Sequence, residues 1–226
     1  MSQEPKAESP KSSIADRLAE VRSRISDAAT SAGRDPSSVR LVAVSKTFPI
    51  NAIREACAAG QVDFGENKVQ EGLQKSSTSA DLSIRWHLLG HVQTNKARKA
   101  VSAFAMIQGV DSLELLQKLD RAAEESEHNP ELLIQVDLAG EATKFGVPPA
   151  EVPRLFEAAA ASRAARVVGL MTLPPVPDTP EDARPYFRRL RELSMGMSGD
   201  FEVAIQEGAT MVRVGTAIFG SRHVEQ

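Results

Sequence analysis

The sequence is poor in cysteine and has no long apolar run. Cys57 is the only cysteine among 226 residues, so no disulfide can form within the chain. This pattern favours a reducing compartment, and we expect a cytoplasmic protein. No apolar run is long enough for a transmembrane helix, and the polar start of the chain lacks the apolar core of a secretory signal. We therefore expect neither a membrane anchor nor export.

Aromatic side chains and excess charge of one sign are also scarce. Aromatic residues make up 4% of the chain and hydrophobic residues 42%, so a full core is possible but must be mainly aliphatic. The formal net charge is −3 and no basic face is evident, which argues against a nucleic-acid partner. Residues 1–11 are polar and charged with two prolines, which predicts a disordered tail before one domain at 12–226.

The domain is expected to begin with an amphipathic helix. Ser13 and Asp16 fit a capping box, and Gly33 is a natural stop. Between them, apolar residues recur at helical spacing, at Ile14, Leu18, Val21, Ile25 and Ala29. One face of this helix is therefore available for burial.

Short β-rich runs then alternate with helical segments to the end of the chain. The eight runs lie at 41–45, 62–65, 86–90, 105–108, 132–137, 167–171, 193–197 and 211–215. Helices are predicted around 50–59, 67–76, 94–103, 112–126, 149–163, 181–192 and 200–208. The later runs are almost continuously apolar, as parallel strands covered on both faces should be. The pattern predicts an α/β fold, a single (β/α)8 TIM-type barrel with an extra N-terminal helix; a doubly wound open sheet is the alternative.

Lys46 directly follows the first predicted strand. In a parallel barrel the carboxyl ends of the strands carry the functional groups, so this lysine is expected at the rim or mouth. A lysine amine there can form a Schiff base with a carbonyl when partial burial favours its neutral form. The alternative is an ordinary surface lysine, and position alone does not decide between them.

Small and hydroxylated residues follow the last two predicted strands. Ser198 lies in the turn after the seventh, and Gly215 and Thr216 follow the eighth. Backbone N–H groups at such turns favour an anion, and the loops after strands seven and eight are the usual phosphate site of a barrel. These three residues are phosphate-ligand candidates, although ordinary turn chemistry explains either motif taken alone.

Arg213 precedes Gly215 by two residues, so both can face the lumen of a regular strand. A cation there needs a partner, which is either a carboxylate or an acceptor on a ligand, such as a heteroaromatic nitrogen. A guanidinium facing a pyridine nitrogen opposes protonation of that nitrogen. The ring is then a poor electron sink, and the site is not suited to transamination.

Other polar residues give weaker indications. Asn67 either caps the next helix or contacts a ligand. His87 and His91 are four residues apart but lie in a strand-like segment, so we assign no metal site. Tyr186 is the only tyrosine, so an evident acid–base partner for Lys46 is missing, and we assign no catalytic residue.

Taken together, the motifs resemble the pyridoxal phosphate homeostasis protein family, whose barrel is similar to the N-terminal domain of alanine racemase. The matching segments are AVSKT at 43–47, FGEN at 64–67 with VQE at 69–71, WHLLG at 86–90 with QTNK at 93–96, GLMT at 169–172, LSMGMS at 193–198 and VRVGTAIFG at 212–220. Two positions depart from the usual pattern: Lys68 stands where Tyr or Arg is common, and Asp137 where Asn is usual.

The resemblance implies pyridoxal 5′-phosphate (PLP) as cofactor, bound covalently to Lys46. It implies that Arg213 faces the pyridine nitrogen, that Ser198, Gly215 and Thr216 hold the phosphate, and that Asn67 and Met171 lie near the ring. The expected function is PLP homeostasis with little or no turnover. Apo forms of PLP enzymes are candidate recipients, and the protein is expected to be a monomer or weak homodimer.

Two other functions compete with this one. An amino-acid racemase of the alanine racemase type uses a β-rich second domain that supplies a catalytic tyrosine, and we do not expect such a domain in these 226 residues after the eighth strand. A sugar-phosphate aldolase is disfavoured because Lys46 lies at the first strand and not late in the barrel.

Overall fold

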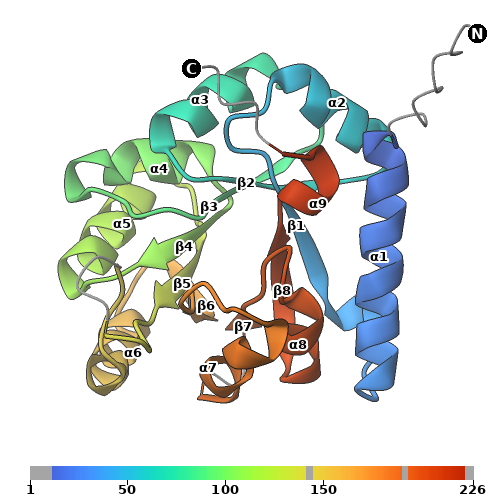
Figure 1. Cartoon of the computed structure of the whole chain (residues 1–226). Coiled ribbons are helices and arrows are strands. Elements are labelled where there is room, and N and C mark those ends of the chain that lie inside the picture. Colours follow the sequence, from blue (N-terminus) through green and yellow to red (C-terminus); the bar gives the residue numbers. More distant parts are fainter. Residues whose placement is uncertain (1–11, 141–144, 190–192, 222–226) are drawn as a thin grey trace, which may run out of the picture.

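Eight parallel strands close into one barrel, with helices around the outside (Figure 1). The computed structural model describes residues 12–140, 145–189 and 193–221. Strand β1 pairs with β2 on one side and with β8 on the other, which completes the circle. The predicted (β/α)8 barrel is therefore confirmed and the open sheet is wrong. The tail predicted at 1–11 lies outside the described residues.

All eight predicted strands are present, with their ends shifted by at most three residues. They are β1 (Arg40–Val44), β2 (Asp63–Glu66), β3 (Arg85–Leu88), β4 (Met106–Val110), β5 (Glu131–Gln135), β6 (Arg166–Met171), β7 (Leu193–Ser194) and β8 (Ala209–Val214). The α-helices are α1 (Ile14–Ser31), α2 (Ile50–Ala58), α3 (Val69–Thr78), α4 (Ala97–Ala103), α5 (Leu113–Ser126), α6 (Val152–Ala160), α7 (Arg184–Arg189), α8 (Phe201–Gln206) and α9 (Thr216–Phe219).

The extra N-terminal helix, α1, forms as expected. The side chain of Ser13 accepts a hydrogen bond from the backbone of Asp16, and Asp16 accepts from the backbone of Ser13, which is a complete capping box. The buried face of α1 packs against α2, α8 and α9. Because α2 follows the first strand while α8 and α9 flank the last, α1 covers the seam where the barrel closes (Figure 1).

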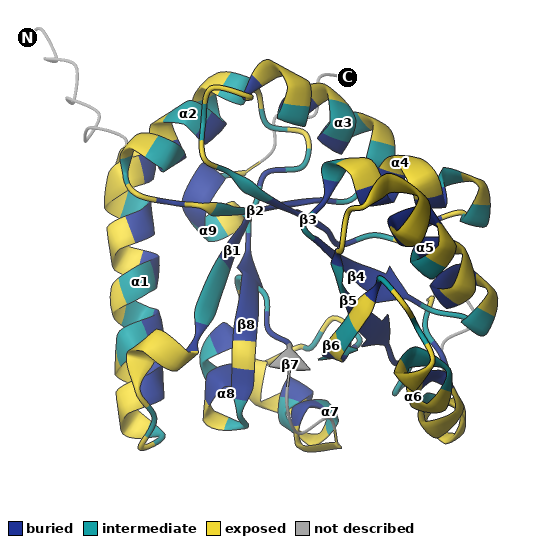
Figure 2. Ribbon diagram, turned by 180° about the vertical axis from the view of Figure 1, so that it is seen from behind, coloured by how far each residue is buried: buried dark blue, intermediate teal, exposed yellow. Residues whose placement is uncertain are grey.

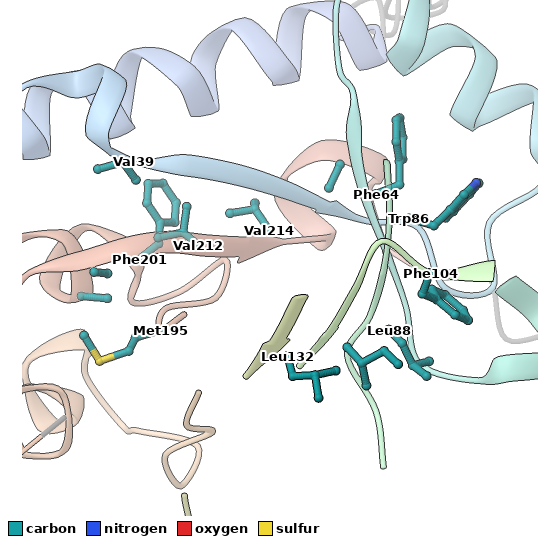
Figure 3. Packing of buried hydrophobic residues seen from close by; sticks show 14 of the residues in the cluster. Val39, Phe64, Trp86, Leu88, Phe104, Leu132, Met195, Phe201, Val212 and Val214 are labelled. Carbon is teal, nitrogen blue, oxygen red and sulfur yellow. The ribbon is translucent and has the colours of Figure 1, made fainter. Parts of the chain in front are cut away.

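The main core lies between the strands and the surrounding helices. Figure 2 shows buried strands inside helices whose outer faces are exposed. Figure 3 shows outward-facing strand residues in this layer, including Phe64 and Trp86, whose ring centroids are 5.9 Å apart. As expected from the low aromatic content, most of the layer is aliphatic. Burial on both faces explains the mainly apolar sequences of strands such as β4 and β5.

A second, smaller cluster fills the barrel lumen. Its buried members come from five different strands and pack on one another, and they are Val42, Met106, Leu133, Met171 and Met211. Unbranched methionine side chains fit the irregular space inside a small barrel. The lumen is therefore a packed floor beneath the mouth and not a channel.

The structure differs from the predicted elements in two places close to the mouth. Strand β7 has only two residues, because at Met195 the chain leaves the sheet and enters a loop. Helix α9, a four-residue helix after β8, was not predicted, because a single turn is too short to give a periodic signal. Within the described ranges, no helix combines the length and apolar character needed to cross a membrane.

Candidate functional site

The strand register brings the sequence-predicted residues to one end of the barrel. Val44 pairs with Gly65, so two residues later Lys46 and Asn67 leave adjacent strands side by side. On the other side, Ala43 pairs with Val214, the residue that precedes Gly215. The carboxyl ends of β1, β2 and β8 thus meet at the barrel mouth, as in other barrels.

Lys46 occupies the second position of a tight turn. The N–H of Phe48 donates to the carbonyl of Ser45 (3.0 Å), and Thr47, the third residue, has φ of 69°. Turns of this kind need a positive φ at the third position, which glycine usually supplies. The lysine itself is half-buried. The predicted placement of Lys46 at the mouth is confirmed, and its role stays a prediction.

The same turn is attached to the segment that follows the last strand. The rings of Phe48 and Phe219 pack with centroids 5.0 Å apart. Phe219 ends α9, the helix that begins at Thr216. This contact ties the Lys46 turn to the phosphate-ligand candidates after β8, although the two are far apart in sequence.

The loop after β7 approaches β8 through a glycine. The N–H of Arg213 donates to the carbonyl of Gly196 (3.0 Å). Gly196 has φ of 86°, and a Cβ there would lie 2.8 Å from the Cα of Phe201. Only glycine fits this backbone without displacement. The position of the loop that carries Ser198 therefore depends on Gly196.

The structure brings Ser198 next to Gly215, which Thr216 directly follows, and their role as phosphate ligands stays a prediction. The N–H of Gly215 lies 3.3 Å from the Oγ of Ser198. Gly215 is the N-cap of α9 and has no side chain with which to cap the first N–H groups of that helix. Ser198 is half-buried and Thr216 exposed. The loop after β7 and the start of α9 thus meet at Ser198 and Gly215, and hydroxyls and backbone N–H groups of this kind are suited to an anion.

Arg213 lies inside the barrel at 4% exposure. Its Nη2 donates to the carbonyl of Thr172 (3.0 Å). Burial lowers the pKa of Arg213 to about 10, opposed by the carboxylate of Asp200, so the side chain remains a cation at neutral pH. The sequence left two alternatives for Arg213, an ion pair with a carboxylate or a hydrogen bond to a ligand in the lumen. This position is compatible with both.

Asp200 is a site residue that the sequence did not reveal. It is buried, and its Oδ1 accepts from the N–H of Met197 (2.6 Å). Burial raises the pKa of Asp200, while the Met197 N–H and the Arg213 charge oppose that rise. Within the described part of the chain, its Oδ2 has no hydrogen-bond partner. Asp200 therefore shapes the Ser198 loop, and it lies close enough to Arg213 for each group to influence the pKa of the other.

Asn67 and Met171 take different positions around the mouth. The N-cap of α3 is Lys68, without a side-chain cap, so of the two alternatives for Asn67 the helix cap is wrong. Asn67 instead lines a surface pocket of about 290 Å³ with Lys68, Val69, Gln70, His91, Gln93 and Lys96. Met171 is fully buried in the lumen floor. Contact of either residue with a ligand stays a prediction.

A chain of polar side chains links the three neighbouring strands β2, β3 and β4. His87 Nε2 lies 2.8 Å from Asp63 Oδ1, and its Nδ1 lies 3.2 Å from the amide of Gln108. Burial would raise the pKa of Asp63, but hydrogen bonds from His87 and Arg85 outweigh it and bring the pKa to about 2. Burial also lowers the pKa of His87. A neutral His87 that donates to Asp63 and accepts from Gln108 satisfies all three groups.

The two histidines considered for a metal have separate environments. His91 pairs with Asp111 (2.6 Å) and stacks on Phe145 with centroids 3.9 Å apart. His87 is buried in the lumen. In the ranges that the structure describes, no three His, Cys, Asp or Glu side chains gather as potential metal ligands.

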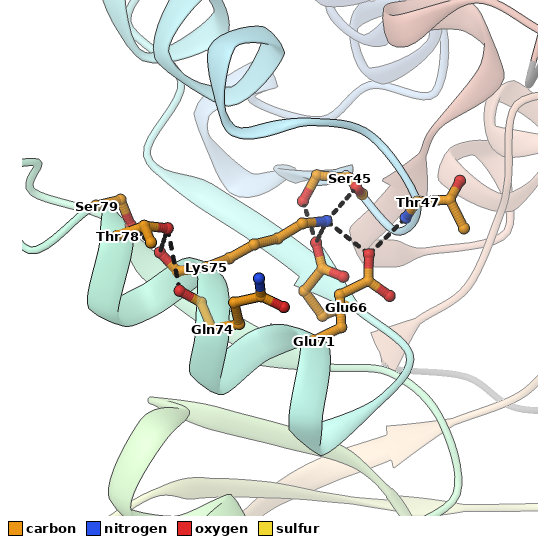
Figure 4. Close-up of polar contacts among 8 residues, drawn as sticks. All are labelled: Ser45, Thr47, Glu66, Glu71, Gln74, Lys75, Thr78 and Ser79. Atoms are coloured by element: carbon orange, nitrogen blue, oxygen red, sulfur yellow. Dashed lines mark hydrogen bonds and ion pairs between the residues drawn. The ribbon is translucent and has the colours of Figure 1, made fainter.

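A buried charged cluster behind the Lys46 turn was also missed. Lys75 of α3 reaches Glu66 of β2 and Glu71 of α3, both at 2.8 Å (Figure 4). The spacing of Glu71 and Lys75, four residues apart on a helix, was a usable signal in the sequence. The contact to Glu66 joins two elements and was not readable from spacing.

The mouth as a whole combines three complementary groups. The turn that carries Lys46 follows β1, the anion-donor candidates follow the neighbouring strands β7 and β8, and the Arg213 cation is buried inside the barrel. This set suits a small molecule that carries a carbonyl, an anionic group and a hydrogen-bond acceptor. The packed floor limits entry to the mouth.

Comparisons with known proteins agree with this geometry. The family profile of the alanine racemase N-terminal domain matches residues 17–223. A relative from Aquifex aeolicus, named pyridoxal phosphate homeostasis protein, is 42% identical over 222 residues, which cover 92% of this chain and 97% of the relative.

Two solved structures are informative in different ways. PipY of Synechococcus elongatus, solved with PLP bound, superposes with a TM-score of 0.79 at 42% identity, covering 92% of this chain and all of PipY. An alanine racemase from Streptomyces coelicolor superposes with a TM-score of 0.71 at 22% identity, covering 93% of this chain and 59% of the racemase. At that identity, the racemase similarity supports the fold alone.

Proposed function

This chain belongs to the pyridoxal phosphate homeostasis protein family, and from that premise we propose that it holds PLP as a Schiff base on Lys46 and serves intracellular PLP homeostasis with little or no turnover. The observation that carries the proposal is the convergence of the Lys46 turn with Ser198 and Gly215 at one barrel mouth. A relative of similar length, PipY, has been solved with PLP bound.

The donor set fits this cofactor. When bound, PLP supplies an aldehyde, with which an amine can condense with loss of water, and a pyridine ring that can withdraw electrons. Lys46 would provide the amine, whose neutral form is the one that condenses with an aldehyde. Ser198, Thr216 and the Gly215 region would hold the phosphate. Asn67 and Met171 are proposed to border the ring.

Arg213 explains why little turnover is expected. We assign it to the ring nitrogen, where a guanidinium can donate but has no proton that it readily gives up. Its pKa of about 10 leaves it charged at neutral pH, so a second cation beside it is disfavoured. Withdrawal of electrons by the ring is then weak, which suits a carrier better than a transaminase.

The racemase alternative receives less support. Its requirement is a tyrosine opposite the lysine, and the sole tyrosine, Tyr186, belongs to α7. That helix follows β6 along the outside of the barrel (Figure 1). The similarity to a racemase at 22% identity concerns the fold.

Transfer and turnover can be measured on the same sample. The cofactor-loaded protein is expected to reactivate an apo PLP enzyme and to leave L-alanine unracemised over many hours. Reactivation should be compared with that by an equal concentration of free PLP. Robust racemisation would show that the protein is an enzyme and not a carrier. Failure to release PLP to any apo-enzyme would contradict the proposed transfer role. A cytoplasmic location, apo-enzymes as recipients and a monomer or weak homodimer are parts of this proposal.

The phosphate assignment predicts a graded loss of affinity. Ser198→Ala and Thr216→Val each remove one hydroxyl, and a hydrogen bond to a charged group contributes roughly 1.5 to 3 kcal/mol. Each change is therefore expected to raise the Kd for PLP by roughly ten- to a hundredfold in a spectroscopic titration. Ser102→Ala, which removes an exposed hydroxyl on α4, serves as the control. Unchanged affinity in both site variants places the phosphate elsewhere.

A further inference from the structure

The buried cluster of Lys75, Glu66 and Glu71 has no part in the function proposed above. Lys75 is 8% exposed and Glu66 is fully buried, which is unusual for charged side chains. Glu66 extends from β2 toward α3, where it meets Lys75 (Figure 4). Helix α3 sits close to the barrel because Gly72 lacks a side chain: a Cβ there would lie 2.1 Å from the ring of Phe104. This close approach brings Lys75 to the sheet.

The cluster holds the residue before Lys46. The amine of Lys75 donates to the carbonyl of Ser45 (2.8 Å), and the hydroxyl of Ser45 donates to Glu66 (2.6 Å) (Figure 4). The hydroxyl of Ser45 and the amine of Lys75 share one acceptor, because Glu66 Oε1 also accepts from Lys75. Backbone and side chain of Ser45 are therefore both fixed by the cluster.

The cluster also holds the residue after Lys46. The N–H of Thr47 donates to Glu71 Oε1 (2.6 Å), and the same oxygen accepts from Lys75 (2.8 Å). The bond from the Thr47 N–H is charge-assisted, which makes it stronger than a neutral one. Thr47 is also the β-branched residue with φ of 69°, a conformation that persists only when its surroundings impose it.

From these contacts, and resting on the role proposed for Lys46, we propose that Lys75, Glu66 and Glu71 are positioning residues that clamp the turn on both sides of Lys46 and aim its amine into the barrel mouth. None of the three needs to touch the cofactor. A buried ion pair is weak evidence for stability, because apolar residues of similar size often serve as well. The charged side chains contribute hydrogen bonds to three groups of one turn: the carbonyl and hydroxyl of Ser45 and the N–H of Thr47.

The charge states support the geometry. Burial raises the pKa of Glu66, while Lys75 and Ser45 oppose that rise. Burial also acts to raise the pKa of Glu71, but the hydrogen bonds from Lys75 and from the Thr47 N–H outweigh it and lower the pKa. Glu71, the residue that holds Thr47, is therefore ionised at neutral pH.

The informative variant is Glu71→Ala. Lys75→Met would leave the buried Glu66 without its ion-pair partner and can prevent folding. Glu71 is partly exposed, with 24% of its side chain accessible, so its loss leaves the Glu66–Lys75 pair in place. Glu71→Gln keeps an acceptor for the Thr47 N–H and serves as the conservative rescue. The matched control is Glu131→Ala, which removes a carboxylate of 30% exposure paired with Arg166 at the opposite end of the barrel.

Two readouts on the cofactor-free full chain test the clamp. The first is amide hydrogen exchange at Thr47. The second is the rate at which PLP, fixed by borohydride at timed intervals, labels Lys46 in a peptide map. In Glu71→Ala we expect exchange to accelerate and labelling to slow, each by roughly tenfold or more, as for loss of a charged hydrogen bond. Glu71→Gln should recover most of both, and Glu131→Ala should match wild type.

The outcomes separate the clamp from the cofactor assignment. If Glu71→Ala exchanges and labels like wild type, or if Glu131→Ala shows the same losses, the clamp is wrong while Lys46 keeps its role. If wild-type protein is labelled at another residue, the proposed function fails first, whatever Glu71 does.

Discussion

Replacing Lys46 with alanine is expected to abolish the visible absorption band that the protein acquires with PLP. The band requires a covalent bond between PLP and an amine. Lys46 is the lysine that follows β1 at the barrel mouth. The anion donors after β7 and β8 remain in this variant, so weak non-covalent binding should persist. The expected change is therefore loss of the band together with loss of all borohydride-fixed cofactor.

A lysine away from the mouth provides the control. Lys99 is an exposed residue on α4, and Lys99→Ala should bind and absorb like wild type. Circular dichroism and thermal unfolding should show that Lys46→Ala is folded, because Lys46 is only half-buried. A Lys46→Ala protein with an undiminished band would falsify the assignment.

The second large effect is expected from Gly196→Ala in the loop after β7. A Cβ at this position would lie 2.8 Å from the Cα of Phe201 and 2.8 Å from the Cβ of Ala204, and φ is 86°. Positive φ costs a residue with a Cβ about 1 to 2 kcal/mol, and overpacking adds about 1 to 3 kcal/mol. The free energy of unfolding should fall by about 2 to 5 kcal/mol in a denaturant titration.

The same change should also weaken cofactor binding. The carbonyl of Gly196 accepts from the N–H of Arg213, and two residues later Ser198 contacts Gly215. Displacement of the loop therefore disturbs the proposed phosphate site. Gly199 of the same loop has no positive φ, and a Cβ added there would meet no atom within 4 Å, so Gly199→Ala should change stability by less than about 0.5 kcal/mol. Equal effects from both glycines would contradict this account of the loop.

The barrel was predictable because a short β-rich run occurs eight times along the sequence. Parallel strands give short β-rich runs, and each of the first seven is followed by a segment with helical features, so errors of a few residues at the ends do not change the topology. Local exceptions escaped the pattern. The two-residue β7 ends early where the chain turns at Gly196, and α9 is a single turn whose formation depends on its neighbours.

The placement of the candidate site residues was predictable where one residue type at one strand end was sufficient. Lys46 after β1, and Ser198 with Gly215 after β7 and β8, follow from the rule that functional groups gather at the carboxyl ends of barrel strands. The residues that act through other residues were missed. Asp200 resembles a helix cap in sequence, and the contact of Glu66 with Lys75 joins a strand to a helix. Only the packed fold brings these partners together.

The most direct test of the central claim is to identify the residue that carries the cofactor. Wild-type protein incubated with PLP, reduced with borohydride and digested should yield one modified peptide, with the added mass on Lys46. A modification spread over several surface lysines, or located on a different lysine of the mouth such as Lys68, would contradict the account.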